Sequence, residues 1–269
     1  MSATENMNTI WMYWENTGKT TPKYIDLCIK TVDKHKGNLK LNVLDQNTIT
    51  QYLPDLRPEW QQLKRLAHKA DYIRTRLTYK YGGMWLDCDM AALAPLEPLF
   101  DFPESLDYAC QNIGTSIGCF VARPSCRLLG QVIAAQDQIL DDNLSGFKWN
   151  GIGNELLTKF SADYDYFKWQ EWTLDEIAGG QTSKLLSRHE TIEGNVDKNA
   201  IIFHFCNEVT GPLIKKYLHD DRLLSSNYLI SKIFRKALQI EDKHKPGFGF
   251  YPSEFYYELI MAIKNHVKF

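Results

Sequence analysis

The stretch GGMWLDCDM, residues 82–90, decides the fold prediction. Two glycines end the preceding pattern, an apolar run follows, and Asp87 and Asp89 then occur two positions apart. The apolar run predicts a strand over 84–88, and side chains at i and i+2 of a strand point to the same face. Two carboxylates placed together repel each other unless a cation lies between them. The stretch therefore predicts a site for a hard divalent cation, Mg²⁺ or Mn²⁺, at a strand end.

Strands and helices are predicted on both sides of this stretch. The chain opens as strand, helix and strand, which favours an α/β fold. Ligands of open α/β sheets usually bind at the carboxyl ends of strands, where the two aspartates lie. The other predicted strands are 9–14, 39–44, 115–122 and 200–206; the predicted helices run from Thr21 to Gly37, from Pro58 to the Gly82-Gly83 stop, over 125–140, and beyond Gly211-Pro212.

Composition limits the class of protein. The 269 residues fit one large domain, or one domain with a helical appendage. A net charge of −2 gives no sign of a nucleic-acid partner. The first residues do not resemble a signal peptide, and no apolar run is long enough for a membrane span. The six cysteines form no CxxC pair, so we expect a reducing, cytoplasmic setting.

Other readings of Asp87 and Asp89 compete with the metal site, because Asp-x-Asp is common by chance. A calcium-binding EF-hand loop is excluded, since its sixth and twelfth positions would be Ala92 and Pro98. A phosphatase of the haloacid-dehalogenase type stays open, with Asp87 as nucleophile and Asp89 as acid and base. Against it, Ala91 stands where that family usually has Thr or Val. A non-catalytic, metal-dependent carbohydrate-binding domain is the third reading.

The helix that precedes the aspartates carries two more candidate residues. Asp71 and Arg74 are three positions apart and therefore share one face of the helix. They are interleaved with the apolar positions Ala70, Ile73 and Leu77. At such positions the two side chains either form a structural ion pair or face a ligand.

Together these residues resemble a known family. D-x-x-R, an apolar run and then G-G-x-W-L-D-x-D look like the core motif of glycosyltransferases with a sugar-binding DxD region. Glycosyltransferase family 32, the bacterial capsular polysaccharide synthesis proteins and the glucosyltransferase domains of large clostridial toxins are similar here. The resemblance covers about 25 residues strongly. Weaker similarities follow in order at residues 10–14, 151–158 and 201–205.

The resemblance implies a GT-A fold, in which a Rossmann-like α/β domain binds a nucleotide sugar through Mn²⁺ or Mg²⁺. Asp89 would ligate the metal directly. Asp87 would contact the metal, through water if not directly, or the ribose. Asp71 and Arg74 would bind hydroxyl groups of the donor sugar. The metal would stabilise charge on the departing nucleotide diphosphate.

Further residues receive roles by the same resemblance. His204 is a third candidate metal ligand. Two observations count against it: a lone histidine in an apolar strand is usually part of the core, and the segment CNEVTGP, residues 206–212, lacks the Trp that is usual there in the family. Trp14 would pack on the nucleobase, or serve ordinary packing. Asn154 and Glu155 would begin a helix at the sugar pocket, or belong to a loop that caps it. Trp11 and Tyr13 are expected in the core, and Trp85 beneath the site.

The resemblance also suggests the reaction and its partners. The relatives retain anomeric configuration; if this enzyme inverted instead, Glu155 would be the first candidate base. We expect a nucleotide-sugar donor, with a UDP-sugar as best guess, and an oligosaccharide or lipid-linked glycan acceptor of a bacterial surface polysaccharide, such as capsule or lipopolysaccharide. Residues 1–210 would form the GT-A domain and 211–269 a helical extension. Residues 234–269 could also rest peripherally on the inner face of the membrane, although a helical cap on the core is favoured.

Overall fold

The computed structural model describes residues 7–16, 20–112, 117–142, 148, 151–177 and 179–241. The chain forms two compact units, each built from several segments. Unit 1 comprises Met1–Thr21, Lys36–Cys88 and Pro95–Glu171, and unit 2 comprises Pro22–His35, Asp89–Ala94 and Trp172–Phe269. The boundary between Cys88 and Asp89 falls inside the Asp-Cys-Asp motif, so Asp87 belongs to unit 1 and Asp89 to unit 2.

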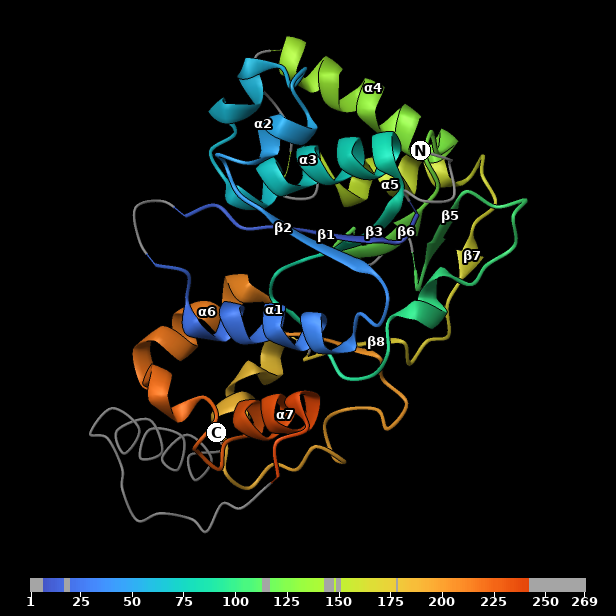
Figure 1. Ribbon diagram of the computed structural model, residues 1–269. Helices are drawn as coiled ribbons and strands as arrows, with labels where there is room; N and C mark the ends of the chain where they lie inside the picture. Colours follow the sequence, from blue (N-terminus) through green and yellow to red (C-terminus); the bar gives the residue numbers. More distant parts are fainter. Residues whose placement is uncertain are drawn as a thin grey trace, which may run out of the picture. The chain divides into compact units, whose positions relative to one another are not determined.

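Unit 1 is organised around a six-stranded mixed sheet in the order β2-β1-β3-β6-β5-β7 (Figure 1). β1 pairs in parallel with β2 and β3, β6 runs antiparallel to β3 and β5, and β7 is parallel to β5. All five residues of β1 are buried, as expected for an interior strand without polar alternation. The strands are Thr9–Tyr13, Lys40–Leu44, Gly83–Leu86, Tyr108–Cys110, Cys119–Ala122 and Phe167–Lys168 for β1, β2, β3, β5, β6 and β7.

Helices cover one face of this sheet (Figure 1). Their apolar sides and the sheet enclose a core that includes Trp11, Tyr72, Trp85 and Phe120. The elements are α2 (Ile49–Tyr52), α3 (Leu66–Tyr81), α4 (Arg127–Asp141) and α5 (Asn154–Ser161), with the short 3-10 helix η1 (Pro58–Gln62). A second 3-10 helix of this unit, η2 (Glu97–Phe100), does not belong to this layer (Figure 1).

Two glycines connect α3 to β3. Gly82 and Gly83 have φ values of +69° and +97°, a region that favours glycine. A Cβ on Gly83 would lie 2.4 Å from the carbonyl oxygen of Thr9, so only glycine lets the chain pass this close to β1. The carbonyl of Gly82 accepts a hydrogen bond from the indole of Trp11 at 2.9 Å. This turn places β3 beside β1, and Asp87 follows directly after the carboxyl end of β3.

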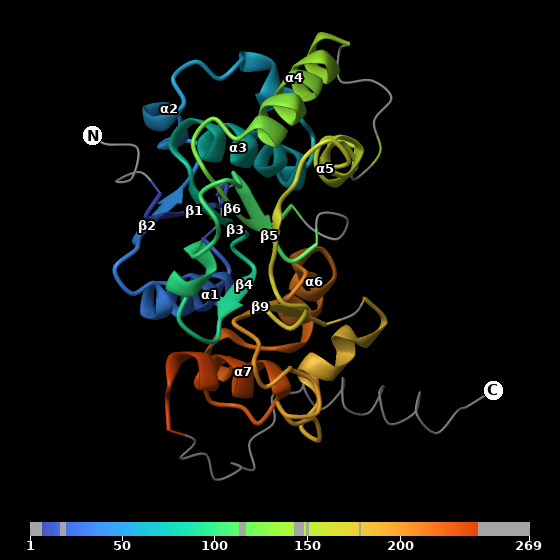
Figure 2. The same ribbon diagram turned by 90° about the vertical axis from the view of Figure 1, so that its right-hand side faces the viewer.

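Unit 2 has its own three-stranded sheet in the order β4-β9-β8. Its strands are β4 (Met90–Ala92), β8 (Leu174–Glu176) and β9 (Ile202–His204), with β9 antiparallel to β4 and parallel to β8. Helices α1 and α7 contact β4 (Figure 2). The helices of this unit are α1 (Lys23–His35), α6 (Asn207–Tyr217) and α7 (Leu229–Leu238), with the 3-10 helices η3 (Gly179–Leu186) and η4 (Asp220–Arg222).

Most predicted elements are confirmed, with different ends. β3 stops at Leu86, before the predicted end at 88, and residues 88–89 form a turn. Strand alternation therefore does not place Asp87 and Asp89 on one face, and that part of the prediction is wrong. The predicted helix from Pro58 is divided into η1 and α3. Gly211-Pro212 lies inside α6, which runs through the predicted boundary at 210/211.

Two further expectations concern membranes. Among the helices that the structure describes, none combines the length and apolarity needed to cross a bilayer. The segment 234–269, considered for a membrane surface, lies outside the described residues from 242 onward. Its predicted membrane contact therefore stays a prediction.

Candidate functional site

In unit 1, Arg74 binds two acidic side chains. Its Nη1 lies 3.2 Å from Oδ1 of Asp71, and its Nη2 donates to Oδ1 of Asp87 at 2.9 Å. The guanidinium also lies over the Trp85 ring, 5.2 Å from the centroid. Only 4% of the Arg74 side chain is exposed. The predicted pairing of Asp71 with Arg74 on one helix face is thus found, and Asp87 joins it.

Asp87 is also bound by the strand that precedes it. The indole N–H of Trp85 donates to the same Oδ1 atom of Asp87 at 2.8 Å. Trp85 is fully buried, as expected for a side chain beneath the site, and its polar atom fixes the carboxylate. A charged and a neutral donor on one oxygen fix the orientation of the Asp87 carboxylate.

Asp71 is buried against α5. A Cβ on Gly153, which precedes that helix, would lie 2.6 Å from Oδ2 of Asp71. The absent side chain of Gly153 is therefore what makes room for the carboxyl group. Burial raises the pKa of Asp71, Arg74 opposes this shift and Asp87 adds to it, which brings the pKa to about 6. Asp71 thus changes charge within a mildly acidic range.

In unit 2, Asp89 pairs with His204. Oδ2 of Asp89 lies 3.4 Å from Nε2 of His204 and accepts the backbone N–H of Asn207 at 2.6 Å. Burial alone would raise the pKa of Asp89, but His204 and this N–H hold it below its ordinary value. Burial likewise opposes charge on His204, yet Asp89 and the neighbouring Cys206 and Glu176 raise the pKa of His204 well above its usual value. The pair is a carboxylate and an imidazolium.

These two side chains suit a divalent ion. A carboxylate oxygen and an imidazole nitrogen converge, and both are donor types that Mn²⁺ accepts. A metal at Nε2 would take the place of the proton on His204. Asp89 and His204 therefore fit the metal that the resemblance implies.

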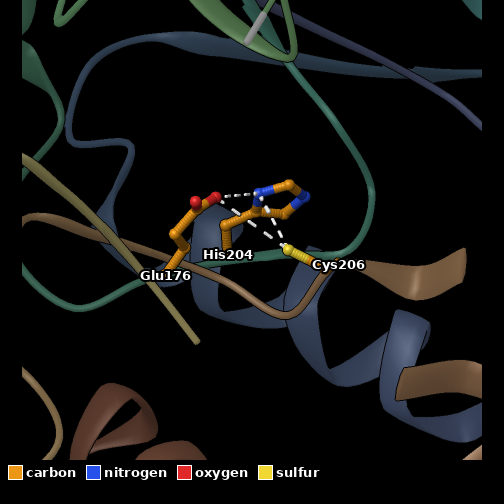
Figure 3. A group of neighbouring side chains, drawn as sticks. All are labelled: Glu176, His204 and Cys206. Atoms are coloured by element: carbon orange, nitrogen blue, oxygen red, sulfur yellow. Dashed lines mark hydrogen bonds and ion pairs between the residues drawn. The ribbon is translucent and has the colours of Figure 1, made fainter. Parts of the chain in front are cut away.

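The opposite edge of His204 faces residues that the sequence did not single out. Its Nδ1 lies 3.3 Å from Oε2 of Glu176 and 3.5 Å from Sγ of Cys206 (Figure 3). Glu176 ends β8, which lies between the predicted helix over 125–140 and the predicted strand over 200–206, and nothing in its sequence context marks it. Cys206 stands two residues after His204, and the H-x-C spacing was the available signal.

The remaining predicted residues have ordinary structural surroundings. Trp14 follows β1, is half-buried, and its backbone N–H donates to the carbonyl of Leu44. Oδ1 of Asn154 accepts the backbone N–H of Ile117, and Glu155 is exposed in the first turn of α5. Their contacts with nucleobase or sugar stay predictions. Trp11 and Tyr13 are buried in the core, as expected.

Comparison with known proteins supports the predicted resemblance. The family model described as capsular polysaccharide synthesis protein matches residues 1–101, which include Asp71, Arg74 and both aspartates of the motif. The resemblance to that family is confirmed over this part of the chain. No curated protein matches the sequence.

Solved structures show the fold. The structure of galactosyltransferase LgtC in complex with donor and acceptor sugar analogues matches with a TM-score of 0.50 at 12% identity, over 86% of this chain and 95% of that one. The apo form of the glycosyltransferase GlyE of Streptococcus pneumoniae TIGR4 matches with a TM-score of 0.49 at 14% identity, over 74% of this chain and 54% of that one. The chain has the mixed α/β arrangement of the GT-A glycosyltransferases, as predicted.

Proposed function

We propose that this chain, in which residues 1–101 match the capsular polysaccharide synthesis family, is a metal-dependent glycosyltransferase. It would move a sugar from a nucleotide-sugar donor, with UDP as the preferred nucleotide, to a growing bacterial surface glycan. The observation that carries the proposal is the Asp89–His204 pair, an oxygen and a nitrogen donor 3.4 Å apart on a GT-A fold.

Asp89 and His204 would hold Mn²⁺ or Mg²⁺, which when bound would neutralise charge on the leaving nucleotide diphosphate. The N–H of Asn207 keeps Asp89 ionised and oriented. The hydroxyl of Tyr24 donates to Oδ1 of Asn207, which helps to fix the start of α6. The carboxylate is thus positioned before the donor arrives, so that little reorganisation accompanies binding.

Asp71 and Asp87 would accept hydrogen bonds from hydroxyl groups of the donor. Arg74 limits the motion of both carboxylates, and its positive charge offsets part of their mutual repulsion. Retention of anomeric configuration would follow if the leaving phosphate accepts the proton of the acceptor hydroxyl on the same face. If the product is inverted, Glu155 would be the base to replace first. NMR of the anomeric configuration in the product decides between the two.

Calorimetry of UDP and GDP, with Mn²⁺ and then with EDTA, tests the donor site. We expect UDP binding that needs Mn²⁺ and that falls at least about tenfold in Asp89→Asn. Asp165→Asn is the matched control, because Asp165 is an exposed aspartate. His204→Gln should weaken binding similarly, with exposed His189→Gln as its control.

Turnover then separates the alternatives. Slow, Mn²⁺-dependent hydrolysis of one UDP-sugar would identify the donor. Release of phosphate from simple esters without nucleotide binding would support the phosphatase instead. Glycan binding without nucleotide affinity would support a carbohydrate-binding domain. The phosphatase alternative is disfavoured because the chain has the GT-A fold and Asp87 is engaged by Arg74 and Trp85.

A further inference from the structure

Glu176, His204 and Cys206 bring three kinds of metal-ligand atom together in unit 2 (Figure 3). Glu176 and His204 are direct register partners of the parallel strands β8 and β9. Cys206 follows as the residue that caps α6, in a left-handed conformation with φ of +54°. Backbone pairing and this turn therefore aim the three side chains at one another.

The distances within this cluster match those around a zinc ion. Bonds of about 2.3 Å to sulfur and about 2.0–2.2 Å to nitrogen and oxygen, at tetrahedral angles, separate N from O by about 3.3 Å and S from N or O by about 3.5 Å. The observed separations are 3.3 Å for Nδ1 to Oε2, 3.5 Å for Sγ to Nδ1 and 3.9 Å for Sγ to Oε2. A shift of a few tenths of an ångström would complete the three-ligand set.

The donor types suit a thiophilic divalent ion. Thiolate, imidazole and carboxylate are all zinc ligands, and a site with three protein ligands keeps its fourth position for water. The thiolate favours Zn²⁺ over Mg²⁺ or Mn²⁺, which prefer oxygen. The Glu176 side chain is 55% exposed, so an ion from solvent can reach the cluster.

Each ring nitrogen of His204 faces a different partner. Nδ1 faces Glu176 and Cys206, whereas Nε2 faces Asp89. A neutral imidazole has one nitrogen with a lone pair and one with a proton. A metal on Nδ1 would leave the proton on Nε2, where it donates to Asp89. A metal on Nε2 would leave the proton on Nδ1, where it donates to Glu176.

We propose that Glu176, Nδ1 of His204 and Cys206 form a zinc site, and that Zn²⁺ there prevents His204 from ligating the donor metal through Nε2. Binding displaces the thiol proton of Cys206 and the proton on Nδ1, and both pass to solvent. The zinc site stands on this cluster alone, while its antagonism to the donor metal rests on the proposed function. The chain would thus lose donor affinity when Zn²⁺ is available.

Titration with Co²⁺, a spectroscopic substitute for Zn²⁺, tests the site without any activity. The reduced, metal-free protein should give a thiolate-to-cobalt charge-transfer band in the near ultraviolet, and Zn²⁺ should abolish the band. Cys206→Ser should lose it and bind Zn²⁺ at least about 100-fold more weakly, since even outer-shell changes cost about 10- to 100-fold. Glu176→Gln should weaken binding in the same direction, and thermal unfolding checks that both variants are folded.

Asp89→Asn separates the two metals. It should keep the cobalt band and weaken Zn²⁺ binding less than Cys206→Ser does, because it removes an outer-shell partner of His204 and no ligand. Mn²⁺-dependent UDP binding should be lost. A band that survives in Cys206→Ser, or Zn²⁺ binding that falls in Asp89→Asn as far as in Cys206→Ser, would overturn the assignment, because the ion would then lie elsewhere or on Nε2.

Competition tests the antagonism. Zn²⁺ should reduce Mn²⁺-dependent UDP binding in wild type and much less in Cys206→Ser, and equal inhibition of both would refute this step. If UDP does not bind with Mn²⁺ at all, the proposed function fails, but the cobalt band still decides whether the zinc site exists.

Discussion

Replacing Asp71 with asparagine should change how the stability of the protein depends on pH. The Asp71 side chain is only 12% exposed, with Gly153 against it and Arg74 beside it. Asparagine keeps nearly the same shape but cannot ionise. The comparison therefore isolates the free energy of placing one negative charge in this environment.

The size of the effect follows from the pKa. Burial, opposed by Arg74 and reinforced by Asp87, raises the pKa of Asp71 from 3.8 to about 6. Between these values the folded protein binds more protons than the unfolded chain, so its stability falls as pH rises. About two pKa units correspond to about 3 kcal/mol. This stability is fully present below the unfolded pKa and is lost once the pH has passed about 6.

Urea unfolding, followed by tryptophan fluorescence between about pH 4 and pH 7, measures the difference. The free energy of unfolding of Asp71→Asn minus that of wild type should grow by about 2 kcal/mol over this range, because at pH 4 the unfolded carboxyl is already partly ionised. Glu193→Gln, which removes an exposed carboxylate, controls for the change in net charge. Parallel curves for Asp71→Asn and wild type would refute the reasoning and mean that Arg74 fully compensates burial.

Three other measurements probe neighbouring features. In urea unfolding, Gly153→Ala should destabilise the protein by about 1–3 kcal/mol, because its Cβ would lie 2.6 Å from Oδ2 of Asp71. Gly194→Ala is the control and should be nearly neutral, because its Cβ would have no contact closer than 3.4 Å. Arg74→Lys should lower the free energy of unfolding by about 3 kcal/mol or more, because the Arg74 side chain is only 4% exposed and bridges two carboxylates. Arg127→Lys is the control and should cost less than about 1 kcal/mol, because that side chain is 66% exposed. Similar losses in both variants would contradict the bridging role. At pH values below the raised pKa of His204, the Mn²⁺ affinity measured by calorimetry should rise about tenfold per pH unit, because the metal displaces the proton on Nε2 of His204. An affinity that does not change with pH would exclude Nε2 as a ligand.

The sequence predicted those features that depend on local patterns. Apolar runs and helical spacing placed the elements of the α/β fold, and the spacing of Asp71 and Arg74 predicted their shared face. Strand alternation does not reach Asp87 and Asp89, because β3 ends at Leu86. This end is set by the pairing of β3 with β6, which no local pattern shows. Pro212 was taken to precede a helix, yet it lies inside α6, whose start is fixed by the contact between Asn207 and Asp89.

Contacts between distant residues left no signal in the sequence. Glu176 reaches His204 only because β8 pairs with β9, and β8 is three residues long in a segment without clear periodicity. Similarly, nothing local shows that Asp71 is buried against Gly153, 82 positions away, since this depends on the packing of α5.

The segmented construction of unit 2 has a consequence for synthesis on the ribosome. β4, which follows Asp89, is paired with β9, and the intervening Pro95–Glu171 belongs to unit 1. Asp89 therefore emerges 115 residues before His204, which is roughly 6 to 23 s at about 5–20 residues per second. Throughout that interval β4 lacks its native neighbour in the sheet and Asp89 lacks its counter-charge. A nascent chain must keep this short apolar strand from pairing elsewhere until β9 has been made.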